Sequence, residues 1–141
     1  MFDLHNELKI VRAVSPVAIG TTGTGKTSAA IDLAGYNAAE ISISYGTVTA
    51  TNAVFTVLLT ECQTTGGTFT SVADADLIGT EALAGLGAAV RTSGTTKNVT
   101  KSVGYKGFMR YIKAKVSSTV TAGTPIGVNV VKGHPRFHPA T

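Results

Sequence analysis

The residues with the clearest chemical pattern are Gly20, Gly25, Lys26 and Thr27, which belong to the stretch GTTGTGKT. This stretch matches the phosphate-binding pattern G-x-x-x-x-G-K-[ST], in which backbone N–H groups surround the phosphates, the lysine reaches the terminal phosphates and the hydroxyl binds Mg²⁺. Such a loop works only where it leaves a buried strand and opens a helix whose N-terminus faces the phosphates. The pattern therefore raises a P-loop nucleotide-binding protein as one hypothesis.

The neighbouring residues give this hypothesis little support. Upstream, residues 10–19 could form a strand, but Arg12 and Pro16 interrupt the apolar run that a parallel sheet requires. Downstream, a helix that began at Ser28 would end after about two turns at Gly35. We therefore interpret the pattern as a decoy: a turn or hairpin tip, followed by an outer strand at residues 27–33.

The remaining chemistry-bearing residues predict neither catalysis nor metal binding. The three histidines, His5, His134 and His138, lie near the two ends of the chain, so no group for acid–base chemistry is evident. His134 and His138 are four residues apart, but each is followed by a proline, which opposes a shared helix face. Residues 74–81 fail the calcium-loop pattern at Ile78. We expect a protein that is not an enzyme and has no cofactor.

The composition favours a subunit of an assembly. Charged residues make up 14% of the 141 residues, whereas an independent small domain usually carries about 25–35% on its surface. Hydrophobic residues make up 43%, and the mean hydropathy is +0.24. The net charge of +4 comes from scattered lysines and arginines, so nucleic acid is not the expected partner. We expect other protein chains to cover part of the surface.

The single cysteine and the lack of long apolar runs argue against disulfides, membrane insertion and secretion. Cys62 is the single cysteine, so no disulfide can form within the chain. No apolar run approaches the roughly 20 residues of a membrane helix, and the N-terminal residues lack the apolar core of a secretory signal. We expect synthesis in the cytoplasm and no membrane partner.

Apolar residues recur at every second position, which predicts strands. Both faces of residues 51–61 are apolar, which is typical of a strand covered on two sides. Residues 74–89 contain three glycines and are expected to form a loop with one helical turn. The prediction is an all-β, single-domain β-sandwich or jelly-roll-like fold with an N-terminal arm (1–9), a core (10–133) and a C-terminal tail (134–141). The four best strand candidates are residues 40–45, 51–61, 108–117 and 126–132.

Several stretches resemble a family of small virion proteins of tailed phages and prophages. They are DLHN at residues 3–6, SVADADLIGTE at 71–81, VGYKG at 103–107, Arg110-Tyr111 and Gly133-His134-Pro135. The resemblance implies a head component, namely a capsid decoration or cement protein on the outside of the major capsid protein shell. In similar proteins, GTTGTG is followed by a variable basic residue, which would remove the lysine requirement at residue 26.

The resemblance also implies that the partners are the major capsid protein and copies of this chain, as a homotrimer at the capsid surface. A tail tube, connector or fibre subunit is the alternative within the virion. The candidate partner contacts are taken from the two arms and from the basic strand at residues 108–117. They are Phe2, Leu4, His5, Arg110, Tyr111, Lys113, His134, Arg136 and Phe137.

Overall fold

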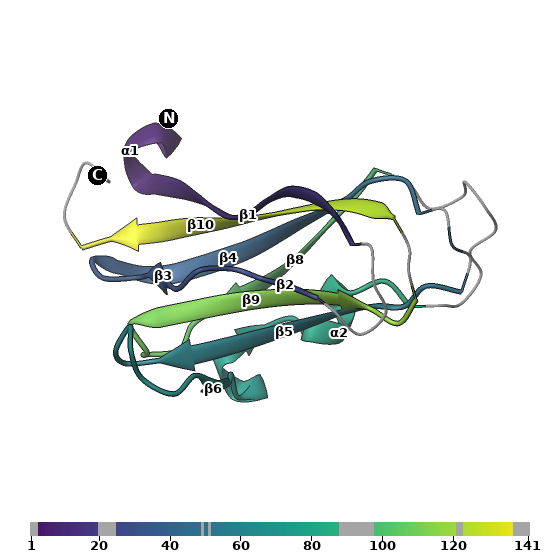
Figure 1. Ribbon diagram of the computed structural model, residues 1–141. Coiled ribbons are helices and arrows are strands. Elements are labelled where there is room, and N and C mark those ends of the chain that lie inside the picture. Colours follow the sequence, from purple (N-terminus) through teal and green to yellow (C-terminus); the bar gives the residue numbers. More distant parts are fainter. Residues whose placement is uncertain are drawn as a thin grey trace.

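The computed structural model describes residues 3–19, 25–48, 50, 52–87, 98–120 and 123–136. Figure 1 shows two layers of strands packed face to face, with β1, β4 and β10 in one layer and β5 and β9 in the other. The strand pairings in the described residues are antiparallel. The predicted all-β sandwich is confirmed.

Two sheets and three short helices make up the described part of the chain. Sheet A has the strand order β1 (Leu8–Ile19), β10 (Thr124–Pro135), β4 (Tyr36–Tyr45), β8 (Val99–Tyr105) and β7 (Leu77–Ile78). Sheet B has the order β2 (Lys26–Thr27), β9 (Tyr111–Ser118), β5 (Phe55–Cys62) and β6 (Thr70–Ser71), and β3 (Ile31–Asp32) also pairs with β9. The helices are α1 (Leu4–Glu7), the 3-10 helix η1 (Asp74–Asp76) and α2 (Glu81–Ala84).

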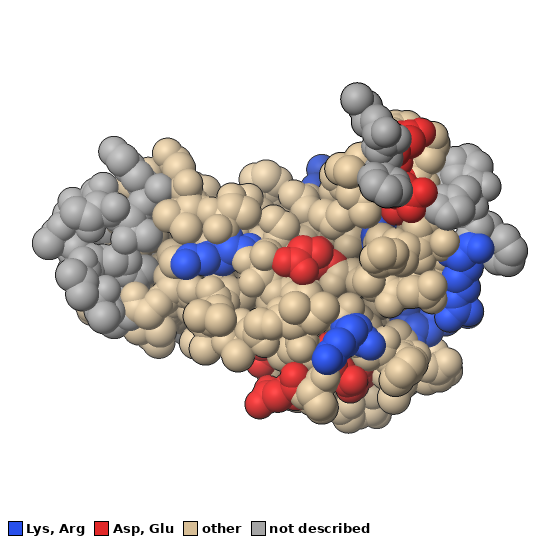
Figure 2. Space-filling model, turned by 180° about the vertical axis from the view of Figure 1, so that it is seen from behind, with Lys and Arg blue, Asp and Glu red and all other residues tan. Residues whose placement is uncertain are grey.

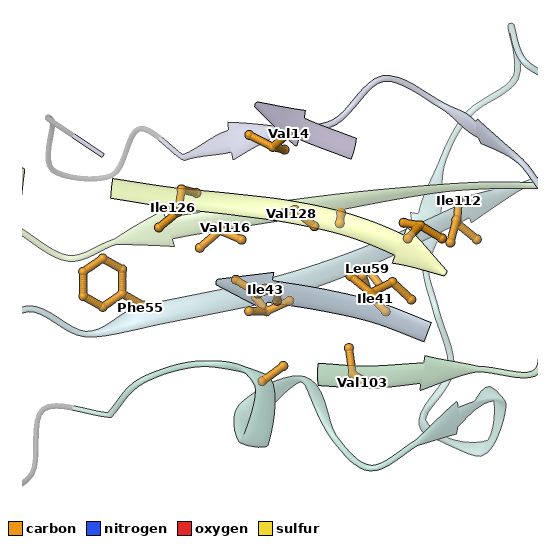
Figure 3. Packing of buried hydrophobic residues seen from close by; sticks show 14 of the residues in the cluster. Val14, Ile41, Ile43, Phe55, Leu59, Val103, Ile112, Val116, Ile126 and Val128 are labelled. Carbon is orange, nitrogen blue, oxygen red and sulfur yellow. The ribbon is translucent and has the colours of Figure 1, made fainter. Parts of the chain in front are cut away.

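The core lies between the two sheets because each long strand turns its apolar positions inward. In β4, Ile41 and Ile43 are fully buried, whereas the intervening Ser42 faces outward. Figure 3 shows these isoleucines beside Leu59 of the opposite sheet. Burial of each such aliphatic side chain stabilises the fold by about 1.5–3 kcal/mol. The apolar residues at every second position in the sequence are therefore those that face the core between the two sheets.

Strand β5 differs from its prediction. Phe55, Val57 and Leu59 face the core, but Thr56 is exposed and Leu58 keeps 39% of its surface accessible. The strand is therefore covered on one side only within this chain. Apolar residues on both faces suggested two covered sides, but one exposed leucine costs little and does not require a second layer.

Strand β1 accommodates Pro16 because it lies at the edge of sheet A. Its pairing with β10 shifts register between Arg12 and Val14 and again between Val14 and Val17. A proline is tolerated at an edge or bulge, where its missing N–H leaves no ladder bond broken. Strand pairing also extends two residues beyond each predicted boundary of the core, to Leu8 and to Pro135.

Candidate functional site

The described end of the phosphate-loop pattern, residues 25–27, leads into strands rather than into a helix. Gly20 lies outside the described residues, whereas Lys26 and Thr27 form β2, which pairs with Val116 and Lys115 of β9. A β-carbon on Gly25 would lie 2.5 Å from the carbonyl oxygen of Val116, so this glycine allows close approach to β9. The next elements are β3 and β4 rather than a helix. Lys26 and Thr27 therefore belong to a strand at the edge of sheet B, whereas a P-loop would open a helix at this point.

A cleft of about 420 Å³ lies at the end of the sandwich where β10 ends and β4 and β9 begin. Its lining consists of residues 33–38, residues 105–110, Gln63 and Arg136. Three of the lining residues are cationic, namely Lys106, Arg110 and Arg136, and none is a carboxylate, histidine or cysteine. The cleft is therefore suited to recognise negative charge. We call this site the cationic cleft.

Tyr105 fixes the loop that forms one wall of the cationic cleft. Its hydroxyl donates a hydrogen bond of 2.6 Å to Oε2 of the buried Glu61 and accepts one of 3.1 Å from the N–H of Met109. Burial raises the pKa of Tyr105, and the bond to Glu61 raises it further, so the hydroxyl stays protonated as a donor. A β-carbon on Gly107 would lie 2.5 Å from this hydroxyl, so the loop can fold over the ring only with glycine there.

Arg110 lines the cationic cleft and pairs with the carboxylate of Asp32, which lies outside the lining. Arg110 donates from Nε to Oδ1 of Asp32 at 3.0 Å and from its terminal nitrogen to Oδ2 at 2.8 Å. The bond from Arg110 holds the pKa of Asp32 below its usual range, and the same pair raises the pKa of Arg110. Both side chains remain accessible, at 49% and 42%. The pair connects β3 to the loop before β9 and leaves the outer side of the guanidinium open.

Arg136 closes the cationic cleft from the end of β10. Its backbone N–H donates to the carbonyl of Gly35 at 2.8 Å, and its Nε donates to Oδ1 of Asn37 at 3.1 Å. Deeper in the same end of the molecule, Lys132 donates from Nζ to the carbonyl of Asp32 at 3.2 Å and stacks over Tyr36 at 4.4 Å. Burial lowers the pKa of Lys132. The bonds to Gly35 and Asn37 hold the guanidinium of Arg136 at the rim.

Two of the predicted partner-contact residues, Arg110 and Arg136, line the cationic cleft, and Arg110 also lies over the ring of Tyr111 at 5.1 Å. Tyr111 and Lys113 lie on the outward face of sheet B, and His134 lies near the end of β10 with a positive φ of 52°. Leu4 and His5 belong to α1, where Leu4 is 68% exposed. Phe2 and Phe137 lie outside the described residues.

Sequence reasoning missed the apolar rim of the cationic cleft. The alternating residues 108–117 predict a strand from Phe108 onward, but β9 begins at Tyr111. Phe108 therefore lies in the loop with 96% of its surface exposed, and Met109 beside it is 41% exposed. The signal that could have indicated this loop was Gly107, which lies two residues after the end of β8 at Tyr105.

The molecular surface has few charges. Figure 2 shows small, separate groups of charged side chains on a mostly uncharged surface. Among the described residues, no group of three or more histidine, cysteine or acidic side chains is placed to hold a metal ion. In the same part of the chain, none of the helices has the length and apolarity needed to cross a membrane.

Comparisons with known proteins find likenesses among solved structures. No protein-family model and no curated protein matches the chain. The chain resembles a solved structure of the CBM22-1–GH10 modules of the Clostridium thermocellum endo-1,4-β-D-xylanase 10B, complexed with xylohexaose, at 12% identity and a TM-score of 0.47. The match covers 97% of this chain and 28% of that chain. We infer no activity and no ligand from a likeness at this level.

Proposed function

We propose that this protein is a non-enzymatic structural protein of a phage virion, a decoration or cement protein that binds the major capsid protein shell and stabilises the head. The outward face of sheet B is the observation that carries the proposal. The resemblance of residues 3–6, 71–81 and 103–107 to small virion proteins supports it, and so does the low charge of the chain.

The outward face of sheet B combines apolar and cationic groups. Leu58 of β5 lies opposite Lys115 of β9, and Thr60 lies opposite Lys113. The ammonium group of Lys113 stacks on the ring of Phe69 at 3.9 Å. The outward positions of β5 and β9 include no carboxylate, because Glu61 points into the core and bonds to Tyr105.

This face suits attachment to a large, flat partner. A stable protein interface buries about 800 Å² on each partner, and a β-sheet face offers such an area without rearrangement. The lysines would give specificity and a faster encounter with an acidic patch on the shell, while Leu58 and the threonines would be buried in the contact. A cement protein needs no catalytic group or cofactor, because it acts by burying surface between neighbouring subunits.

Attachment to heads tests the proposal. Heads are purified from the phage that encodes the chain after deletion of its gene, mixed with the purified protein and sedimented. We expect the protein to co-sediment with these heads and to raise the temperature at which they release DNA. A Lys113→Glu/Lys115→Glu variant should co-sediment at least tenfold less. Lys9→Glu/Arg12→Glu changes the net charge equally on β1 of sheet A and should co-sediment like the wild type.

Two results would overturn the proposal. One is wild-type protein that stays in the supernatant with such heads. The other is its recovery from purified tails rather than heads, which would assign it to the tail tube, connector or fibre instead.

A further inference from the structure

The chain carries an acidic counterpart to the cationic cleft. We define the acidic segment as residues 74–83, which run from η1 through β7 to the middle of α2. Asp74 is exposed and Asp76 is partly exposed, while Ile78 and Leu83 keep 61% and 66% of their surfaces accessible. The segment therefore presents carboxylates beside two apolar side chains. The cationic cleft presents cations beside Phe108 and Met109.

These charges have no ion-pair partners within the described part of the chain. Arg110 already pairs with Asp32, but no ion pair there involves Lys106, Arg136, Asp74 or Asp76. The surface has few charged groups. Those that are unpaired can therefore make a contact with another molecule specific.

The acidic segment cannot enter the cationic cleft of its own chain. Leu77 and Ile78 pair with Tyr105 and Gly104, which holds the segment in β7 at the edge of sheet A. The N–H of Lys106 also donates to the carbonyl of Asp76 at 2.9 Å, so the backbone is tied down beside the cleft. No residue of the segment lines the cleft. A matching segment must therefore come from another molecule.

We propose that the cationic cleft of one copy of this chain binds the acidic segment of a second copy. Lys106 and Arg136 face the carboxylates of Asp74 and Asp76, while Phe108 packs on Ile78 of the other copy. The occupant is a second copy because complementary charge and apolar groups are both present on this one sequence. The contact needs no capsid, so it can fail or hold independently of attachment to heads.

The chemistry of the contact predicts its behaviour. A cleft of about 420 Å³ admits only a few side chains, so the contact falls among weak interfaces. Its ion pairs lie at the surface and are screened by salt. Sedimentation velocity over a concentration series should show self-association at about 0.05 M salt. The dissociation constant should rise at least tenfold at about 0.5 M salt.

Charge reversal identifies the two surfaces. Lys106→Glu/Arg136→Glu alone and Asp74→Lys/Asp76→Lys alone should each raise the dissociation constant at least tenfold. An equimolar mixture of the two variants should associate again, because the intact cleft of one accepts the intact segment of the other. The Arg12→Glu/Lys26→Glu variant is the matched control and should associate like the wild type. Circular dichroism of each variant verifies that it is folded.

Three outcomes would overturn the proposal. The first is a wild-type chain that stays monomeric throughout the series. The second is self-association that neither cleft nor segment reversal weakens. The third is a monomeric chain whose cleft variants lose binding to an acidic peptide or an oligonucleotide, which would assign the cleft to another protein or to nucleic acid.

Discussion

Replacement of Tyr105 by phenylalanine tests how the cationic cleft is held in place. The change removes only the hydroxyl, which donates to the buried Glu61 at 2.6 Å and accepts from Met109 N–H at 3.1 Å. A hydrogen bond to a charged group contributes about 1.5–3 kcal/mol, and the carboxylate left behind is 9% exposed and poorly hydrated. The N–H of Met109 lies in a loop and can bond to water instead. We expect Tyr105→Phe to lower the free energy of unfolding by about 2–3 kcal/mol.

Tyr45 provides the matched control. It is as deeply buried as Tyr105, but its hydroxyl donates to the neutral carbonyl of Ala84 at 2.9 Å, so Tyr45→Phe should cost only about 1 kcal/mol. Urea unfolding followed by circular dichroism measures both variants. With a denaturant slope of about 2 kcal/mol per molar, Tyr105→Phe should lower the midpoint by about 1 M and Tyr45→Phe by about half as much. Equal losses for the two variants would refute the assignment of Glu61 as a charged acceptor held by Tyr105.

Three further predictions follow from other contacts. Gly25→Ala should lower the melting temperature, because its β-carbon would lie 2.5 Å from the carbonyl oxygen of Val116; an unchanged melting curve would mean that β2 does not pack on β9. Burial raises the pKa of both tyrosines discussed above, so the folded state binds more protons than the unfolded state at alkaline pH. Unfolding free energy should therefore fall above about pH 10, by about 1.4 kcal/mol per pH unit for each tyrosine, and the phenylalanine variants should each flatten the slope. The pKa of Asp32 is lowered by Arg110, so the stability from this pair is present above about pH 4 and is lost as the pH falls further; Asp32→Asn should flatten the acid limb of the stability profile.

The strands could be predicted where one face is buried and the other is not. Residues 40–45 and 126–132 alternate because their inward side chains meet the core, and they lie within β4 and β10. Strand β8 was missed, since its outward positions are Thr100, Ser102 and Gly104, which are also typical of loops. Strand order remained open in the sequence because alternation identifies a strand without identifying its neighbour.

The cationic cleft could not be predicted because it depends on pairings between distant segments. Arg110 precedes β9 and Arg136 follows β10, and these strands lie in different sheets. They meet at one end of the sandwich only because β10 pairs with β4 while β3 pairs with β9. The residue types were identified in the sequence, and their juxtaposition is a property of the topology.

The stretch GTTGTGKT illustrates why a motif needs its structural context. A helix N-terminus binds phosphate because successive N–H groups point the same way, whereas a strand points them alternately to either side. Residues 28–34 have the composition of a helix, but Ile31 and Leu33 are buried with a period of two. Ser28 holds the segment extended along β9 rather than helical. Its N–H donates to the carbonyl of Ala114 at 2.9 Å, and its hydroxyl accepts from the N–H of Ala114 at 3.0 Å. Residues 26–28 thus pair with β9 at the point where a P-loop would open a helix.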